Sequence, residues 1–544
     1  MILVQNNLYA KLFASRSVLS FLVVIMMLLS CILRVAVVAT GGYVDIAIDQ
    51  SLYRINVSRI RGTIYDCNMV PLTNNAKKTI AAVSPTPKGV LAISRCANNE
   101  SLDNALEILK NNKPTISTVN ETIDGEGIAF TTVYEQTIEM FTACHLIGYT
   151  DSSGHGVTGL QLAYDDFLYS DEFVSAVFTT GGNGDILSGV EPFFENDISI
   201  TNSGVVTTID INIQNIVEAA AAKMKSGCAI VAEVNSGKIR AMASVPTFKI
   251  NSISESFKNP DSPMINRALS AYSVGSIFKP CVAAAALEAK QGSHIFECKG
   301  SLEIVDRVFR CHDLTGHGII NLQGAIAKSC NCFFYNFALN LGYQPIYNMM
   351  SSLSFGSKIK ICENMYTQQG VIPKMNTLSN QGALANLSIG QGDLLLSPVS
   401  MLTLYMSIAG DGSYYLPSIV EKTVKDGVEN TYDKGNPTRV MNADTAEKLR
   451  EYLKTVIMDG TGSEAAPTIT TAAGKTATAQ TGRYYDDGSE ITNSWFCGFF
   501  PAENPRYVVV VMSDNRLNVS TASLFAEIAD KITDYSGEKS KKDS

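Results

Sequence analysis

A serine and a lysine three residues apart, Ser276 and Lys279, are the first candidates for covalent chemistry. Residues i and i+3 of a helix share a face, so the lysine amine lies beside the serine hydroxyl. Pro280 indicates that the regular helix begins near Ser276, where the helix dipole stabilises a developing anion. A desolvated, neutral lysine can accept the serine proton. The pattern recurs at residues 357–360 and 536–539, and a serine cap with a solvated lysine is the simpler explanation of one such tetrad alone.

The second candidate is the tripeptide Ser329-Cys330-Asn331, which interrupts an apolar stretch predicted to be helical. A hydroxyl and an amide at this spacing can be presented together to a cleft. Taken alone, the tripeptide is better explained as a helix break or cap, because Ser and Asn side chains compete for nearby backbone groups.

The third candidate is Lys475-Thr476-Ala477-Thr478, on a predicted strand. Alternation places Lys475 and Ala477 on one face and Thr476 and Thr478 on the other. The backbone N–H groups of an edge strand can also form an oxyanion hole. By itself the tetrapeptide is typical of a surface strand.

The elements that position these residues begin near Val205, where the sequence pattern changes. VVTTIDI alternates as a strand, IQNIVEAAAAKM has helical spacing, and CAIVAEVNSGKIRAMASVP predicts a hairpin. Helices are predicted at CVAAAALEAK and LQGAIAKSCNCFFYNFALNLG. Three strand-like runs with short connections, TTAAGKTATAQTG, TNSWFCGFFP and RYVVVVMSDN, predict an antiparallel meander followed by the helix LFAEIADKITDY. We predict an α+β domain, with helices around an antiparallel sheet.

A membrane anchor is predicted near the N-terminus. Residues 17–33 carry no charge, and as a helix they span about 25 Å, just short of a bilayer core. The span reaches Ala39 if Arg34 snorkels to the interface. The basic Lys11 and Arg16 place the preceding residues in the cytoplasm and the rest outside. A cleaved signal peptide, cut near residues 37–39, is the alternative, but the apolar region is long for one.

The composition excludes several classes of protein. Of the 544 residues, 46% are hydrophobic and 17% are charged, so the chain can bury a large core and is not mainly disordered. The 43 basic and 52 acidic residues give a net charge of −9, which argues against nucleic-acid binding. The length predicts two or three domains.

In this order, the three motifs resemble those of the penicillin-binding protein transpeptidases, whose second and third motifs are S-D-N and K-T-G. Other segments resemble the family in the family's order, among them TTIDINIQ, GKIRAMASVPTF, GHGIINLQGAIAKSCNCFFY, IGQGDLLLSPVSML and NSWFCGFFPAENPRYVVVV. RGTIYDCNMVPLTNN, soon after the anchor, is similar to class B members. The resemblance implies a class B penicillin-binding protein with a penicillin-binding transpeptidase domain. We expect a cytoplasmic tail (1–16), a transmembrane anchor (17–39), a β-rich, dimerisation-like pedestal (40–205), a transpeptidase domain (206–535) and a charged tail (536–544).

The resemblance also implies roles for single residues. Ser276 is expected to be the acylated nucleophile and Lys279 its proton acceptor. Ser329 is expected to relay protons to the leaving group, and Asn331 to hold the amide of the acyl chain. Lys475 is expected to orient Ser329 and to add positive charge.

The third motif carries substrate contacts and one departure from the family. Thr476 and Thr478 are expected to contact the substrate carboxylate, and the N–H groups of Ser276 and Thr478 to form the oxyanion hole. Ala477 stands where the family has glycine, a residue that lets a substrate backbone approach closely. We expect the added methyl group to narrow the cleft while activity survives.

The implied function is a peptidoglycan D,D-transpeptidase that acts on stem peptides, is blocked by β-lactams, needs no cofactor and works with a membrane glycan polymerase. D,D-carboxypeptidases and β-lactamases share the nucleophile, but the anchor and pedestal argue against both. A β-lactam-sensing receptor would need more membrane spans. A catalytically silent scaffold remains the alternative of a different class, because of Ala477. A Ser-His-Asp hydrolase using His312 or His317 is disfavoured, since their segment resembles a family GHG element.

The cysteines and histidines point to no metal centre in the sequence. Twelve cysteines in a chain of this length do not form a disulfide-dense pattern. Cys298 and Cys311 bracket KGSLEIVDRVFR, a predicted hairpin, so a disulfide between them is one expectation and two free buried thiols the other. The five histidines lack zinc-ligand spacing, so we predict no metal site.

Overall fold

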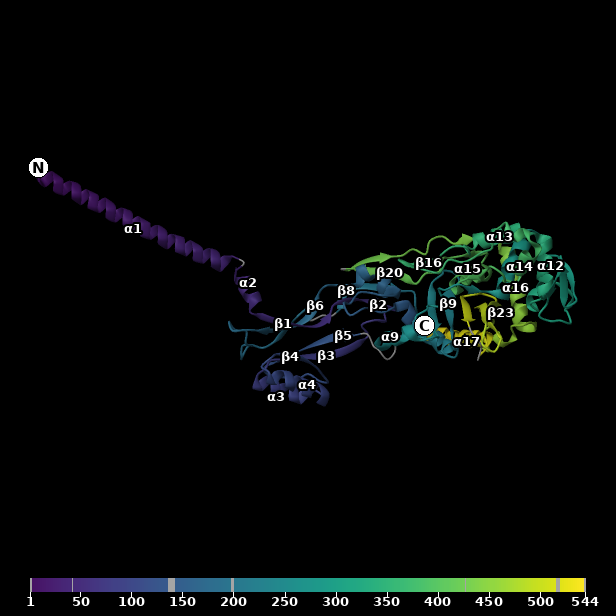
Figure 1. Cartoon of the computed structure of the whole chain (residues 1–544), viewed down its shortest axis with the longest axis horizontal. Helices are drawn as coiled ribbons and strands as arrows, with labels where there is room; N and C mark the ends of the chain where they lie inside the picture. Colours follow the sequence, from purple (N-terminus) through teal and green to yellow (C-terminus); the bar gives the residue numbers. More distant parts are fainter. Residues whose placement is uncertain are drawn as a thin grey trace. The chain divides into compact units, whose positions relative to one another are not determined.

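The computed structural model describes residues 2–41, 43–135, 142–196, 200–425, 427–514 and 519–542 (Figure 1). Contacts between residues divide the chain into two units. The smaller unit comprises residues 1–60, 77–134 and 171–199, and the larger comprises residues 61–76, 135–170 and 200–544.

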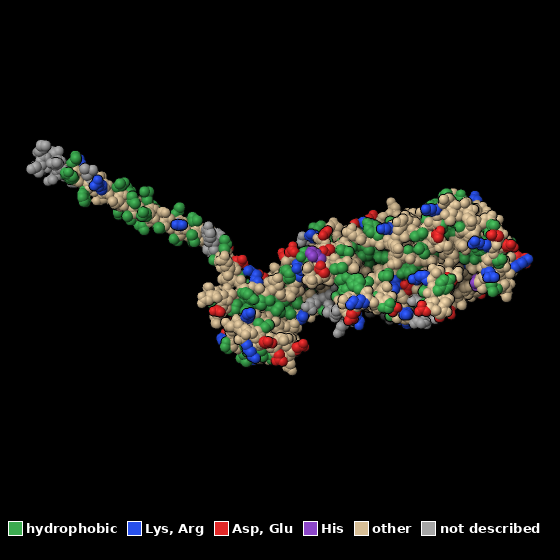
Figure 2. Space-filling model, in the orientation of Figure 1, with side chains coloured by type: hydrophobic (Ala, Val, Ile, Leu, Met, Phe, Trp, Pro, Cys, Tyr) green, Lys and Arg blue, Asp and Glu red, His purple; other side chains and the backbone are tan. Residues whose placement is uncertain are grey.

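The chain begins with the long helix α1 (Ile2–Thr40). Its segment Phe13–Thr40 has a mean hydropathy of 2.8, is unburied, and is long and apolar enough to cross a membrane. Figure 2 shows apolar side chains along this helix with few charged ones between them. A helix whose apolar side chains face no protein partner needs another apolar environment, which agrees with the predicted anchor.

The rest of the smaller unit holds a short helix, α2 (Tyr43–Gln50), and two three-stranded sheets. The first sheet has the order β1 (Leu52–Arg59), β6 (Phe173–Thr179), β7 (Phe193–Glu195). The second has the order β4 (Thr115–Val119), β3 (Ala76–Val83), β5 (Ile128–Glu135). Helices α3 (Pro87–Cys96) and α4 (Asn99–Lys110) bury Ile93 and Leu109 in one cluster with residues of the second sheet. The predicted β-rich N-terminal region is therefore present.

The larger unit includes two segments from before residue 205. Strand β2 (Arg61–Tyr65) pairs in parallel with β8 (Ile200–Thr207), which pairs antiparallel with β20 (Val420–Lys425). Strand β21 (Val428–Thr431) completes this sheet. Short helices α5 (Cys144–Ile147), α6 (Gly159–Ala163) and α7 (Asp165–Leu168) belong to the same unit. This division differs from a boundary near residue 205, because the hydrogen bonds of β2 join an earlier segment to the larger unit.

A five-stranded antiparallel sheet forms the centre of the larger unit. Its order is β10 (Ile239–Val245), β9 (Gly227–Glu233), β25 (Tyr507–Ser513), β24 (Glu490–Phe500), β23 (Ala473–Tyr484). The predicted hairpin is the β9–β10 pair, and the predicted meander is β23–β24–β25. Strand β23, which carries the third motif, lies at the edge of the sheet.

Helices cover both faces of this sheet, as the alternation of its buried side chains requires. Val509 and Val511 share a core cluster with side chains of α8 (Ile211–Ala221) and α17 (Thr521–Lys542). Val508 and Val510 belong to the other, larger cluster with α15 (Pro398–Ala409). The predicted α+β architecture, including the C-terminal helix, is confirmed (Figure 1).

Helix α9 (Ile253–Lys258) packs against a small cluster around Tyr149 and Phe248. The other remaining helices pack mainly on the α15 side of the sheet, where they bury side chains in the larger cluster. They are α10 (Lys279–Glu288), α11 (Leu322–Ala327), α12 (Asn331–Leu341), α13 (Tyr343–Ser352), α14 (Gln381–Ser388) and α16 (Ala443–Asp459). Two small antiparallel strand pairs lie beside α12. One pairs β12 (Ile295–Cys298) with β15 (Gly318–Asn321), and the other is the hairpin of β13 (Ser301–Ile304) and β14 (Arg307–Arg310).

Candidate active site

Ser276 lies in a 3-10 turn, η2 (Gly275–Phe278), that leads directly into α10. Its side chain is partly exposed, whereas its neighbours Gly275 and Ile277 are buried. Gly275 has a φ of +61°, and a Cβ there would stand 3.0 Å from the Cβ of Ala479 on β23. Only glycine combines this left-handed backbone with so close an approach to a strand. The turn Gly275–Phe278, which we call the serine turn, therefore packs closely against β23 at the edge of the sheet.

Backbone and aromatic groups hold this turn in place. The Gly275 N–H donates to the carbonyl of Gly390 at 2.9 Å. The buried Trp495 donates from Nε1 to the Ser273 carbonyl at 3.0 Å, and the buried Tyr405 donates from its hydroxyl to the Ile277 carbonyl at 3.1 Å. These hydrogen bonds restrict the movement of the turn before any substrate binds.

Lys279 is the centre of a polar cluster that it forms with Ser329 and Asn331. Its side chain is fully buried, and its Nζ donates to the Ser329 carbonyl (2.6 Å), to Ser329 Oγ (3.2 Å) and to Asn331 Oδ1 (2.7 Å). Burial lowers the pKa of this amine to about 7. A lysine amine with such a pKa is partly neutral near pH 7 and has a lone pair for a proton.

The second motif occupies a break between two helices. The stretch predicted as largely helical is split into α11 and α12, because Ser329 has a φ of +52°. Cys330 caps α12, and its Sγ accepts from the Phe333 N–H at 3.4 Å. The break turns Ser329 and Asn331 toward the same lysine. The tripeptide is thus a helix cap and part of the polar cluster at once.

The third motif follows the predicted alternation along β23. Lys475 and Ala477 are buried, while Thr476 is half-buried and Thr478 is exposed. Lys475 Nζ donates to the Thr476 carbonyl at 3.0 Å and to Thr461 Oγ1 at 3.4 Å. The pKa of Lys475 is well below its usual value, first because of burial and second because of the nearby charge of Lys279.

Thr461 contacts the third motif, and sequence reasoning did not identify it. Its Oγ1 lies 3.0 Å from Thr476 Oγ1, and its N–H donates to the Ala327 carbonyl at 3.2 Å, two residues before Ser329. It therefore bridges the second and third motifs. Among the described side chains, the hydrogen bonds of Lys475 go to Thr461 and Thr476, so direct orientation of Ser329 by Lys475 stays a prediction.

Comparison with known proteins decides the family. A model described as the penicillin binding protein transpeptidase domain matches residues 227–534. This chain belongs to that family. PbpB of Mycolicibacterium smegmatis is 29% identical over 418 residues, which are 71% of this chain and 62% of that protein. Peptidoglycan D,D-transpeptidase MrdA of Acinetobacter baumannii is 26% identical over 422 residues, 70% of this chain and 60% of that protein.

Solved structures show the same fold. Penicillin-binding protein 3 of Mycobacterium tuberculosis in complex with ampicillin has a TM-score of 0.64 at 23% identity, covering 89% of this chain and 96% of the other. The D,D-transpeptidase domain of a peptidoglycan glycosyltransferase from Eggerthella lenta gives a TM-score of 0.65 at 22% identity, covering 89% of this chain and 100% of the other. The predicted resemblance to class B penicillin-binding proteins is confirmed. The chain spans about six tenths of the length of PbpB and of MrdA.

Ala477 of this penicillin-binding protein points to the buried face of β23. Its side chain is 7% exposed, and its Cβ is 3.5 Å from the position that a Cβ on Gly275 would take. The methyl group therefore packs toward the serine turn. Narrowing of the substrate cleft by this methyl group stays a prediction.

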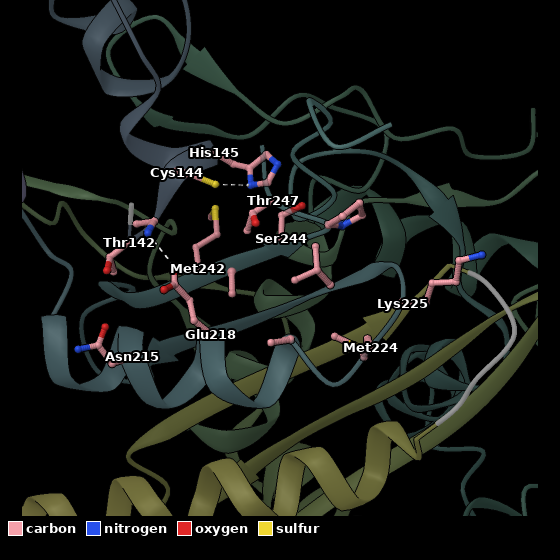
Figure 3. A pocket seen from close by; sticks show the side chains of 15 residues that line it. Thr142, Cys144, His145, Asn215, Glu218, Met224, Lys225, Met242, Ser244 and Thr247 are labelled. Carbon is pink, nitrogen blue, oxygen red and sulfur yellow. Dashed lines mark hydrogen bonds between the residues drawn. The ribbon is translucent and has the colours of Figure 1, made fainter. Parts of the chain in front are cut away.

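A separate cavity of about 550 Å³ lies between α8, β10 and the segment around Cys144 (Figure 3). His145, Glu218 and Lys225 are among its lining residues. Burial lowers the pKa of His145 to about 4 and raises that of the Glu218 carboxyl. No residue of the three motifs lines this cavity, so we do not assign it to the reaction.

Of the two expectations for Cys298 and Cys311, the structure has two free buried thiols rather than a disulfide. The hairpin between Cys298 and Cys311 exists as β13–β14, but both cysteines are free in the structure. Their sulfur atoms lie instead in a cluster with His317 and Cys330 that could hold a metal ion. The prediction of no metal site relied on short-range ligand spacing, whereas these ligands come from four separate segments.

Proposed function

We propose that this protein is a peptidoglycan D,D-transpeptidase acting through an acyl-enzyme at Ser276. The observation that supports this most is the convergence of Ser329 and Asn331 on the buried amine of Lys279, three residues after Ser276. A serine nucleophile needs a base near its hydroxyl and a second group that can pass a proton to the leaving amine. Lys279 of the first motif and Ser329 of the second are the candidates for these two groups.

Acylation begins when Ser276 Oγ attacks the carbonyl of the penultimate D-Ala of a stem peptide. The serine proton passes to neutral Lys279, and the backbone N–H groups of Ser276 and Thr478 stabilise the oxyanion. The peptide bond breaks, and the amine of the departing D-Ala receives a proton through Ser329. Asn331 holds the amide of the acyl chain.

Deacylation completes the transfer. The amine of a neighbouring stem peptide attacks the ester carbonyl, its proton returns through the same groups, and Ser276 is released as the cross-link forms.

Thr476 and Thr478, on the outward face of β23, bind the terminal carboxylate of the substrate. A bound carboxylate also favours the charged form of Lys475, whose pKa is low in the free protein. β-Lactams react at the same serine and form a stable ester.

Location and partners follow from this function. An anchor within Phe13–Thr40, with basic residues before it, places the catalytic domain outside the membrane, where peptidoglycan is assembled. A membrane glycan polymerase is the proposed partner, since it would supply the strands to be cross-linked.

Product analysis tests transfer against its alternatives. The full chain in detergent is given an acyl-D-Ala-D-Ala peptide with increasing amounts of a D-amino acid acceptor. We expect the transfer product to rise with the acceptor while hydrolysis falls. Hydrolysis alone at every acceptor concentration would instead identify a D,D-carboxypeptidase. Neither product, together with no covalent penicillin adduct, would identify the scaffold that Ala477 makes the second candidate.

The pKa of Lys279 predicts how acylation depends on pH. The neutral amine is the base, and its fraction falls about tenfold for each unit below a pKa of about 7. The second-order rate of penicillin acylation should therefore rise from about pH 5 to pH 7 and level off above. Stopped-flow measurements with a fluorescent penicillin give this profile, and a rate that is flat from pH 5 to pH 9 would rule out Lys279 as the base.

Replacing Ala477 with glycine tests the steric role of its methyl group. The methyl group packs toward the serine turn, so its removal should speed penicillin acylation by about tenfold, the effect of one methyl-sized group in a binding site. Ala473→Gly is the matched control, because Ala473 is buried on the same face of β23 and lies before the motif. No gain over wild type in Ala477→Gly would show that the methyl group does not restrict the site.

A further inference from the structure

Four side chains that can bind a metal ion come together from four segments at the second motif. Cys298 ends β12, Cys311 follows β14, His317 precedes β15, and Cys330 stands between α11 and α12. Their three sulfur atoms and one imidazole nitrogen all lie within 4.8 Å of one another. The three cysteines are at most 4% exposed, and His317 is half-buried.

Two distances within this cluster are close to those expected around a tetrahedral ion. Zinc binds cysteine sulfur at about 2.3 Å and histidine nitrogen at about 2.0 Å, which places ligand sulfurs about 3.8 Å apart and sulfur and nitrogen about 3.5 Å apart. Cys311 Sγ lies 4.0 Å from Cys330 Sγ and 3.6 Å from His317 Nδ1. The sulfur–sulfur and the sulfur–nitrogen separation are therefore each close to that of two ligands bound to one ion.

A disulfide explains the cluster less well. Cys332 is a further thiol in contact with Cys311 and Cys298. Any disulfide, with its S–S bond of about 2.05 Å, would still leave the imidazole of His317 without a role. The three cysteines of the cluster are free thiols in the structure, and their sulfur atoms lie within 4.8 Å of the imidazole nitrogen. Three cysteines and one histidine form a closed ligand set of the kind found in structural zinc sites.

We propose that Cys298, Cys311, His317 and Cys330 bind one structural zinc ion. Binding releases the protons of the three thiols, so the ion is held by three thiolates and one neutral imidazole. The Phe333 N–H, which donates to Cys330 Sγ at the start of α12, stabilises one of these thiolates. Binding of the ion does not depend on the proposed transpeptidase function.

The place of Cys330 in the chain gives the ion a positioning role, and this part rests on the proposed function. Cys330 is the middle residue of Ser329-Cys330-Asn331, whose outer residues contact Lys279. The ion would join this loop to the segments around β12, β14 and β15, which are otherwise distant in sequence. It would thereby fix the left-handed backbone of Ser329 beside the lysine.

Metal analysis of the full chain in detergent tests the site. We expect about one zinc per chain after purification without added metal, and replacement by cobalt(II) should give the absorption bands of a tetrahedral thiolate complex. Cys298→Ser should weaken the sulfur-to-cobalt band. His317→Gln should release zinc to a chelator at about 100-fold lower chelator concentration than wild type.

Matched variants separate loss of the site from loss of the fold. His312→Gln changes a histidine next to Cys311 that is outside the ligand set, and Cys362→Ser removes a thiol elsewhere, so both should retain zinc and cobalt bands. Circular dichroism shows independently that each variant is folded. A wild-type protein that is acylated by penicillin but binds neither zinc nor cobalt would overturn the proposal. So would a disulfide between Cys311 and Cys330 in the purified protein, shown by mass spectrometry.

Discussion

Ser276→Ala is expected to abolish covalent labelling by fluorescent penicillin. The substitution removes the oxygen that we propose forms the ester. It changes little else, because the turn is held by contacts to Ser273, Gly275 and Ile277 rather than by the serine hydroxyl. Loss of a catalytic serine lowers the rate of a serine hydrolase by about a millionfold. Gel fluorescence after incubation of the full chain with the penicillin measures this loss.

Ser273→Ala is the matched control for this experiment. Ser273 lies three residues earlier, and its backbone carbonyl, which the substitution retains, accepts the hydrogen bond from Trp495. We expect labelling of this variant at the wild-type level. Persistent labelling of Ser276→Ala at the wild-type rate would assign the nucleophile to another residue and remove the basis of the proposed mechanism.

Lys279→Met is expected to lower the rate of acylation by about 10²–10⁴-fold, the usual contribution of a general base. Methionine fills a similar buried volume but cannot accept a proton. It also leaves the Ser329 carbonyl and Asn331 Oδ1 without the donor that they share. The second-order rate constant with fluorescent penicillin measures the effect, and circular dichroism checks the fold.

Lys279→Arg distinguishes a base from a group that only positions its neighbours. Arginine retains positive charge and hydrogen-bond donors for Ser329 and Asn331, yet it does not lose its proton in proteins. If Lys279 acts as the base, the arginine variant should be as slow as the methionine variant and should lose the rise in rate toward pH 7. An arginine variant close to wild type would show that Lys279 serves only to hold the second motif.

Local patterns in the sequence predicted much of the fold. The continuous apolar run VVVVMS and the period-two alternation around Lys475 identified two strands of the meander, and the short connections between the three runs indicated that they pair antiparallel. The same alternation placed Ala477 on the face of Lys475, and the structure shows that this face is the buried one. The order of the three motifs identified the family, although each motif alone was better explained as a cap or a surface strand.

Features that depend on distant contacts were not predicted. The break at Ser329 lies inside a strongly helical pattern, and tertiary contacts override local preference there. Thr461 joins the site from a turn after α16 and carries no motif, although Gly460 before it gives a weak signal: a side chain there would collide with the Ala327 carbonyl.

The cysteine and histidine cluster illustrates the same limit. Cys298 and Cys330 are separated by three strands and a helix, so no spacing rule for consecutive ligands applies. The sequence shows that cysteines and a histidine are present, but it does not show that the fold brings their side chains together. The pairing of β2 with β8 was missed for a similar reason, since a parallel pair joins segments far apart in the chain.

Mapping of the penicillin adduct tests the central claim most directly. The full chain is incubated with penicillin, digested with trypsin and analysed by fragment mass spectrometry. The relevant peptide spans residues 268–290, because trypsin does not readily cut before Pro280, and it contains Ser270, Ser273 and Ser276. We predict one penicilloyl group, located on Ser276. An adduct on another residue, or no adduct on a folded protein, would contradict the proposed acyl-enzyme.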